Sequence, residues 1–220
     1  MKVLSIQAGA ARDVAPTGGS EWWDKEWRTG FHKQVVLQPV WLAYEGFPDD
    51  EQADRVNHGG VDKAVCVYAG EHYPQWRLQP ELATMEFGAF GENLTTEGLL
   101  EAAVCIGDAF ALGGAVVQVS QPRQPCWKLA RRWRLKNLSA QVERTGRTGF
   151  YFRVLRHGEV RAGDSFTLLE RPFPEWTIAR CNEVMHHLKS DKPLARLLSE
   201  CPLLSASWKD ALWARAQSGE

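Results

Sequence analysis

The hydrophobic pattern of the chain changes near residue 171, and this change constrains the fold more than any other feature. Before it, short apolar runs alternate with turns that contain Gly or Pro, which is typical of β-strands. Residues 170–175 contain two prolines and mark a linker. After it, apolar residues recur at helical spacing. We therefore predict a mostly β domain over residues 1–171 and a small three-helix region over residues 172–220.

The first part of the chain predicts a β-barrel with few helices. Two apolar runs, 110–112 and 115–119, flank Gly113-Gly114 and predict a tight hairpin. A second hairpin is expected from 150–155 to 166–169, with its turn at His157-Gly158. Further strands are expected over 3–6, 35–44 and 63–68, and a long Trp-rich loop over 13–30. Strands at this spacing with long returns favour a barrel over a βαβ sheet.

Helices are predicted at five places. Residues 71–82 form a helical pattern with Pro74 in the first turn, and the basic segment 127–138 forms another. In the C-terminal region Thr177 and Ser205 are expected to cap helices, and Pro193 to start one between them. These three short amphipathic helices should pack on each other and on the barrel.

Composition excludes several classes of protein. The 220 residues carry a net charge of −1, which argues against a general nucleic-acid-coating protein. No run approaches the ~18 apolar residues of a membrane span, and residues 3–6 indicate a strand rather than a signal peptide. The five cysteines are odd in number and lack a CxxC pair, so we expect a cytoplasmic protein with free thiols.

The strongest candidate for chemistry is Cys126, within Ser-Gln-Pro-Arg-Gln-Pro-Cys-Trp-Lys at 120–128. The two prolines stiffen the backbone before an expected helix start. Nearby Arg123 and Lys128 and the helix N-terminus would favour a thiolate, which attacks electrophiles and binds soft metals. The alternative for a free cysteine is a buried, inert role, which we expect for Cys66, Cys105 and Cys181.

Two glycine-containing motifs are weaker candidates. Gly59 and Gly60 would let backbone N–H groups approach an anion, with Lys63 adding charge, although a plain turn before a strand has the same sequence. Asn93, two residues after Gly91, could bond the edge of a heterocycle or merely its own turn.

Charge is unevenly distributed. Residues 120–147 hold eight cations and one carboxylate, Glu143, which suits either an anionic ligand or a solvated helix face. Nucleic-acid binding with Trp127 and Trp133 as stacking groups is a weaker alternative. The five carboxylates between Glu45 and Asp54 are expected to form mostly a solvated acidic loop.

Taken together, these motifs resemble the MOSC family, named after the C-terminal domain of molybdenum-cofactor sulfurase. The matching segments are Glu-Gln-Ala-Asp at 51–54, HGGVDKAV at 58–65, FGENLT at 90–95, IGDAF at 106–110 and QVSQPRQPCWKL at 118–129. The C-terminal helices resemble the extension of small bacterial MOSC proteins of the YiiM type. The resemblance covers residues 30–215, of which about 30–170 match the barrel.

The resemblance implies a MOSC-type β-barrel that binds a pterin-molybdenum cofactor. Cys126 would supply a sulfur ligand to molybdenum. His58, Gly59, Gly60, Lys63 and Arg123 would lie around the phosphate and pterin, with Asn93 near the same cleft. Family proteins are also associated with pyridoxal phosphate, for which Lys63 would be the residue to form a Schiff base.

The activity implied is reduction of small N-hydroxylated compounds, such as 6-hydroxylaminopurine, to the amine. Since the chain has no four clustered cysteines for an iron–sulfur centre, a separate reductase would supply electrons. We expect no membrane and no specific nucleic-acid partner, and the Trp-rich loop suggests a homodimer. Two alternatives stay open: a module that carries the cofactor or a persulfide, and a metal-free thiol enzyme that uses Cys126 and His58.

Overall fold

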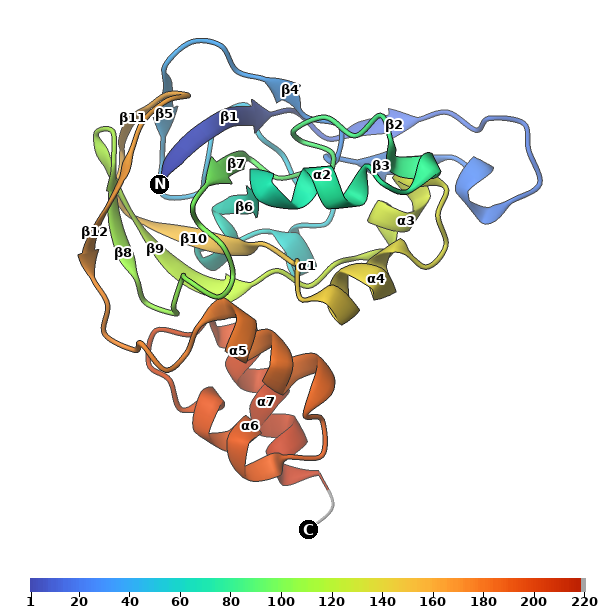
Figure 1. The fold of residues 1–220 in the computed structure, drawn as a ribbon. Coiled ribbons are helices and arrows are strands. Elements are labelled where there is room, and N and C mark those ends of the chain that lie inside the picture. Colours follow the sequence, from blue (N-terminus) through green and yellow to red (C-terminus); the bar gives the residue numbers. More distant parts are fainter. Residues whose placement is uncertain (219–220) are drawn as a thin grey trace.

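The computed structural model describes residues 1–218 and contains one curled sheet, seven α-helices and two small sheets (Figure 1). The strands of the large sheet follow the order β12-β8-β9-β10-β6-β7-β1-β4. Their bounds are β1 Lys2–Ala8, β4 Gln34–Val35, β6 Val65–Ala69, β7 Leu94–Glu97, β8 Ala109–Leu112, β9 Ala115–Pro122, β10 Phe150–Arg156 and β12 Phe166–Glu170. Neighbours are antiparallel except β6 and β7.

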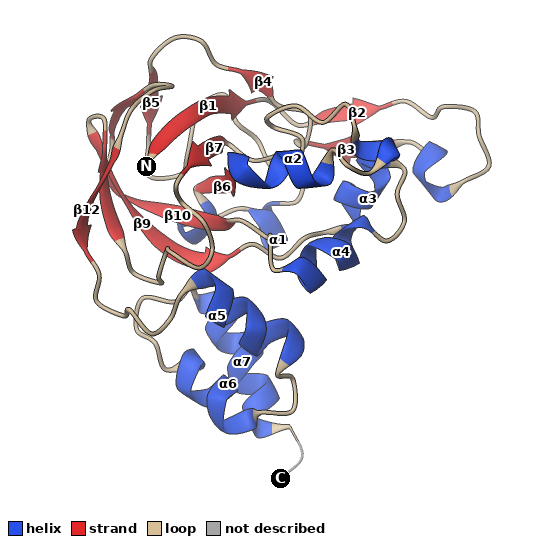
Figure 2. Ribbon diagram, viewed as in Figure 1, coloured by secondary structure: helices blue, strands red, loops and turns tan. Residues whose placement is uncertain are grey.

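The sheet curls so that β1 meets the segment just before β12. Lys2 forms a β-bridge with Ser165, and the Val3 N–H donates to the Asp164 carbonyl at 2.9 Å. The predicted mostly β, barrel-like fold is confirmed. Figure 2 shows the helices gathered to one side of and below this sheet.

The predicted hairpin at Gly113-Gly114 is present, since β8 pairs with β9 in register around Leu112 and Ala115. The second predicted hairpin is wrong. β10 lies between β9 and β6, so both of its edges are already paired. The chain after it therefore pairs elsewhere: β11 (Gly158–Val160) joins β5 (Val40–Leu42), and β12 joins β8. Gly158 permits this route, because a Cβ there would lie 2.3 Å from the Gly114 carbonyl carbon.

Three expected elements are shorter or divided. The segment 13–30 is not all loop, because β2 (Arg12–Val14) pairs with β3 (Trp27–Thr29). The helix over 71–82 reduces to α2 (Tyr73–Trp76), with Pro74 in its first turn, because Pro80 forces an extended residue before it. The basic helix splits into α3 (Trp127–Trp133) and α4 (Leu138–Thr145), since Arg134 adopts a left-handed conformation with φ +50°. The strand over 35–44 likewise divides into the end of β4 and β5.

The remaining helical elements are short. They are α1 Arg55–His58, α5 Ile178–Asn182, α6 Lys192–Ser199 and α7 Ala206–Gln217, with 3₁₀ turns at Trp22–Asp24, Val61–Lys63, Gly70–His72 and Pro80–Leu82 and a π-helical turn at Glu183–His187. Thr177 and Ser205 cap α5 and α7 as predicted, accepting hydrogen bonds from Arg180 N–H and Trp208 N–H.

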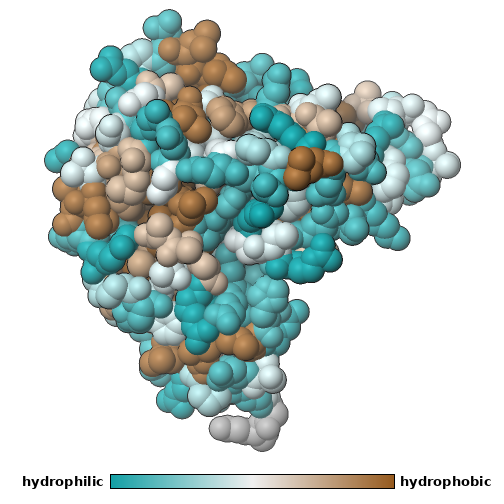
Figure 3. All heavy atoms as spheres, in the orientation of Figure 1, coloured by the Kyte–Doolittle hydropathy of each residue, from teal (hydrophilic) through white to brown (hydrophobic). Residues whose placement is uncertain are grey.

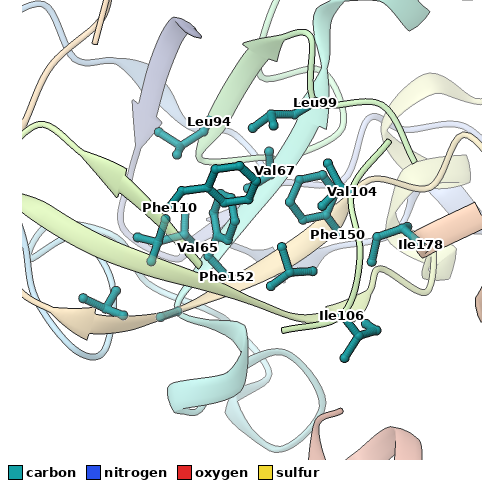
Figure 4. Packing of buried hydrophobic residues seen from close by; sticks show 14 of the residues in the cluster. Val65, Val67, Leu94, Leu99, Val104, Ile106, Phe110, Phe150, Phe152 and Ile178 are labelled. Carbon is teal, nitrogen blue, oxygen red and sulfur yellow. The ribbon is translucent and has the colours of Figure 1, made fainter. Parts of the chain in front are cut away.

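One apolar core joins the sheet to the C-terminal helices. Phe110, Phe150 and Phe152 point into the curl of the sheet, and Ile178 of α5 extends the same cluster (Figure 4). Trp208 of α7, 1% exposed, belongs to it as well. A second cluster, around Tyr68, lies under α2, α3 and α4. On the face in Figure 3, apolar patches are scattered among hydrophilic surface. None of the helices within residues 1–218 is long and apolar enough to cross a membrane.

Candidate functional site

One cavity brings together five of the seven predicted site residues, and we call it the inner cavity. His58, Lys63, Asn93, Arg123 and Cys126 line it, with about 570 Å³ of empty space including its open mouth. Gly59 and Gly60 do not line it: they form the turn between α1 and Val61–Lys63, and the Gly59 N–H donates to the Arg55 carbonyl within α1. Contact of these two glycines with a cofactor therefore stays a prediction.

Cys126 stands half-buried at the junction of a stiff loop and a helix. β9 ends at Pro122, and Cys126 is the N-cap residue of α3 in an extended conformation. Its carbonyl accepts a hydrogen bond from the Ser139 hydroxyl at 2.9 Å, which ties the loop to α4. The other four cysteines are buried, so Cys126 is the most accessible of the five free thiols.

Arg123 carries a buried positive charge into the same cavity. It is 6% exposed, and its guanidinium donates to the Phe90 carbonyl. Among residues 1–218, no carboxylate forms an ion pair with it. The Phe31 ring lies 5.8 Å from the guanidinium, and the buried carboxylate of Glu92 acts on it only from beyond ion-pair distance. A buried cation without a carboxylate partner is costly, and an anionic ligand would relieve that cost.

His58 and Lys63 are polar groups whose environment disfavours charge. Burial, together with the positive charge of Arg123, lowers the pKa of His58 to about 4, so its imidazole is neutral at pH 7. Burial also lowers the pKa of Lys63, whose ammonium donates to the Asn57 carbonyl at 2.7 Å. Asp54 fixes this segment by capping α1, accepting from the Asn57 N–H at 3.0 Å.

Asn93 lines the cavity but also braces the sheet. Its side-chain oxygen accepts from the Cys66 N–H at 3.0 Å, and its amide nitrogen donates to the Gln7 carbonyl at 3.2 Å. These bonds join the chain around β6 to β1. One amide hydrogen remains for a ligand, so recognition of a heterocycle edge stays a prediction.

Sequence reasoning missed four residues on the wall of the cavity. Lys33 and Asp50 form a buried ion pair, with side chains 6% and 3% exposed, so the expectation of a solvated acidic loop is wrong for Asp50. Tyr151, in β10, lies beside Cys66, which was expected to be an inert core thiol. Burial raises the pKa of Tyr151 and that of Cys66, so both stay protonated at pH 7. No local pattern marks these residues. Cys66 and Tyr151 meet through the pairing of β6 with β10, and Lys33 and Asp50 meet from loop positions 17 residues apart.

Some basic side chains of the segment 120–147 line the inner cavity, and others hold neighbouring loops in place. Lys128 lines the cavity with Arg123, whereas Arg131 donates to carbonyls of the 13–30 segment and lies 5.0 Å from the Trp27 ring. Arg132 donates to the Phe31 and Gly88 carbonyls at 2.9 and 3.0 Å. Half-buried Trp133 packs against the second cluster, and the Arg132 guanidinium lies 5.5 Å from its ring, so the ring is not a free stacking surface.

Comparison with known proteins agrees with this fold. The family model "MOSC domain" matches residues 54–167, more than half of the chain, and the chain belongs to the MOSC family. A second model, "YiiM-like, 3-alpha helix domain", matches residues 176–219, so within the family the chain has the YiiM-like arrangement of barrel and helices.

Individual relatives extend along almost the whole chain. An uncharacterized protein of Bacillus subtilis, YflK, is 46% identical over 210 residues, 94% of this chain and 90% of its own. A protein of Gibberella moniliformis named "Reductase" is 37% identical over 92% of this chain, which spans only 35% of that protein. The crystal structure of YiiM from Geobacillus stearothermophilus superposes with a TM-score of 0.79 at 34% identity, covering 98% of both chains.

Proposed function

We propose that the protein is a molybdenum-cofactor-dependent reductase of small N-hydroxylated compounds. The observation that carries the proposal is the inner cavity, where a buried guanidinium without a carboxylate partner lies near a half-exposed thiol. An anionic group and a soft metal in one ligand would satisfy both residues at once. Membership of the MOSC family and the fungal relative named "Reductase" support the same reading.

The residues of the cavity fit such a cofactor. Arg123, with Lys128 and Lys63 on the same wall, would hold the phosphate and the polar edge of the pterin, and Cys126 would be the sulfur ligand of the metal. Within residues 1–218 no three His, Cys, Asp or Glu side chains form a metal cluster, so the metal would have to enter with the cofactor. The bound cofactor would supply two-electron chemistry that side chains cannot perform.

The overall reaction converts R–NHOH, two electrons and two protons into R–NH₂ and water. The N–O bond breaks, both electrons come from a separate reductase, and the protons come from solvent through the open mouth. His58 is neutral at pH 7 and offers one donor and one acceptor, so it would orient the hydroxylamine without opposing the charge of Arg123. Tyr151 keeps its proton and would donate a hydrogen bond.

The test is cofactor content followed by turnover. We expect protein from a host that makes the cofactor to contain molybdenum and pterin in near-stoichiometric amounts and to reduce 6-hydroxylaminopurine when given a reductase. Cys126→Ser should lose molybdenum and activity but keep pterin. Cys105→Ser, a buried thiol away from the cavity, is the matched control and should retain all three.

Three outcomes separate the alternatives. Full turnover by Cys126→Ala at wild-type molybdenum content would contradict the proposal. A loaded protein without turnover, or with labile sulfur on Cys126, would indicate a carrier of cofactor or persulfide. Absence of pterin and molybdenum under conditions that load a control protein would direct attention to pyridoxal phosphate at Lys63. Cytoplasmic location and a homodimer stay predictions.

A further inference from the structure

A second hollow borders Cys126 toward α7, and we call it the outer hollow. It contains about 1010 Å³ of empty space including its mouth. It shares five lining residues with the inner cavity: Asp54, His58, Lys63, Cys126 and Tyr151. Its other walls are Asn57, Gln121, Gln124, Pro125, Trp127 and Ser207. Cys126 thus borders two spaces with different lining residues: Arg123 lines the inner cavity only, and Trp127 lines the outer hollow only.

We infer that the outer hollow is the substrate site, that it takes a neutral, planar nitrogen heterocycle, and that α7 of the three-helix region forms one wall. This inference rests on the proposed function, in which the inner cavity holds the cofactor. A substrate in the outer hollow would reach the same thiol-bearing loop from the side of α7. The inference extends the site to residues beyond position 200, which the sequence assigns to a separate region.

The chemistry of the walls selects the ligand. Trp127 is 51% exposed, and the rings of Trp22 and Trp27 lie 6.2 and 6.0 Å from its ring. The Arg131 guanidinium and the Lys128 ammonium lie 5.6 and 5.9 Å from the ring centroid, so the exposed remainder of the ring is the braced surface for stacking. The exposed amide of Gln124 supplies both a donor and an acceptor, as the edge of a nitrogen heterocycle requires.

The charged groups of the outer hollow are already engaged. The Asp54 carboxylate accepts two hydrogen bonds from Asn57, and the Lys63 ammonium donates to the Asn57 carbonyl. His58 is neutral at pH 7. In contrast to the inner cavity with Arg123, this hollow therefore presents no buried charge that a ligand must neutralise, and it suits a neutral ring.

The start of α7 is fixed against the barrel at this point. The Ser205 N–H donates to the Ser120 carbonyl of β9 at 2.9 Å, and the Ser207 hydroxyl donates to the Gln121 side-chain oxygen at 3.2 Å. Trp208, buried in the shared core, anchors the next position. These contacts hold Ser207 at the wall of the outer hollow.

The experiment fills the hollow from α7. Ser207→Trp places a large side chain on the wall, and Ala206→Trp, one exposed residue earlier and outside the lining, is the matched control. For Ser207→Trp we expect wild-type pterin and molybdenum content, a Kd for adenine raised by about tenfold or more in calorimetry, and a similar rise in KM for 6-hydroxylaminopurine. Ala206→Trp should stay within about twofold of wild type.

Gln124→Ala provides a second variant on an exposed loop position, in case the bulky residue disturbs α7. Losing the amide should raise the same Kd by about five- to tenfold with unchanged cofactor content. Unchanged adenine binding and KM in both variants would overturn the inference while leaving the proposed function intact. A different result would separate the two ideas. If both variants weaken adenine binding but the wild-type protein reduces no N-hydroxylated compound, the ligand site is supported and the proposed function is contradicted.

Discussion

Replacing Glu92 by Gln should destabilise the loop that aims Arg123 into the inner cavity. Glu92 is fully buried, and its carboxylate accepts hydrogen bonds from four groups: the N–H of Gly88 at 2.8 Å, the N–H of Phe90 at 3.1 Å, the Thr95 hydroxyl at 2.8 Å and the Tyr73 hydroxyl. The Phe90 carbonyl in turn accepts from the Arg123 guanidinium. One carboxylate therefore organises the loop that positions the cation.

The magnitude follows from these bonds. Gln keeps the shape of Glu but turns one oxygen into a donor, so the Phe90 N–H, alone on the second oxygen, loses its acceptor. A buried donor without a partner costs ~1–3 kcal/mol. The three bonds at the other oxygen become neutral, and each weakens by roughly 1 kcal/mol or less. Together we expect the free energy of unfolding to fall by about 4 kcal/mol.

The assay is urea unfolding followed by tryptophan fluorescence and circular dichroism. Glu97→Gln is the matched control, because Glu97 is 52% exposed and its ion pair with Lys2 at 2.9 Å should contribute less than about 1 kcal/mol. Hydrogen exchange at residues 88–93 should accelerate in Glu92→Gln alone. The reasoning would be refuted if Glu92→Gln lowered the free energy of unfolding by an amount within about 1 kcal/mol of the Glu97→Gln effect and left hydrogen exchange at residues 88–93 unchanged.

Three further predictions concern accessibility, pH and the Trp-rich segment. Folded, cofactor-free protein should react rapidly with Ellman's reagent at a single thiol, absent in Cys126→Ser, because the other four cysteines are buried. Several fast thiols would contradict this burial. Stability should fall between pH 6.5 and about 4, since the unfolded state protonates His58 near 6.5 while burial lowers its folded pKa to about 4; His58→Gln should flatten the slope of unfolding free energy against pH. Arg131→Gln should lower the free energy of unfolding by about 1–2 kcal/mol and speed proteolysis within residues 13–30. Arg144→Gln, at an exposed position, should do neither. Equal digestion of the two variants would disprove that Arg131 anchors the segment.

Much of the candidate site was predictable because its signals are local. Two prolines around Arg123 stiffen the chain before Cys126, and the helix start follows directly in the sequence. His58 ends α1 and Lys63 ends the 3₁₀ turn that follows, five residues later, and both line the cavity. The partners Lys33 and Tyr151 were not predictable, because Lys33 meets Asp50 and Tyr151 meets Cys66 across long stretches of sequence.

The same division holds for the fold. The turn at Gly113-Gly114 and the caps Thr177 and Ser205 depend on nearest neighbours in the chain, so the sequence alone determined them. The tertiary structure decided that β10 lies inside the sheet with both edges paired, which leaves no edge for the expected second hairpin. It also brought Ser207 to the outer hollow, because burial of Trp208 in the shared core holds α7 against β9. Apolar patterns specify which face is buried but not which partner covers it, and only the packed chain makes that choice.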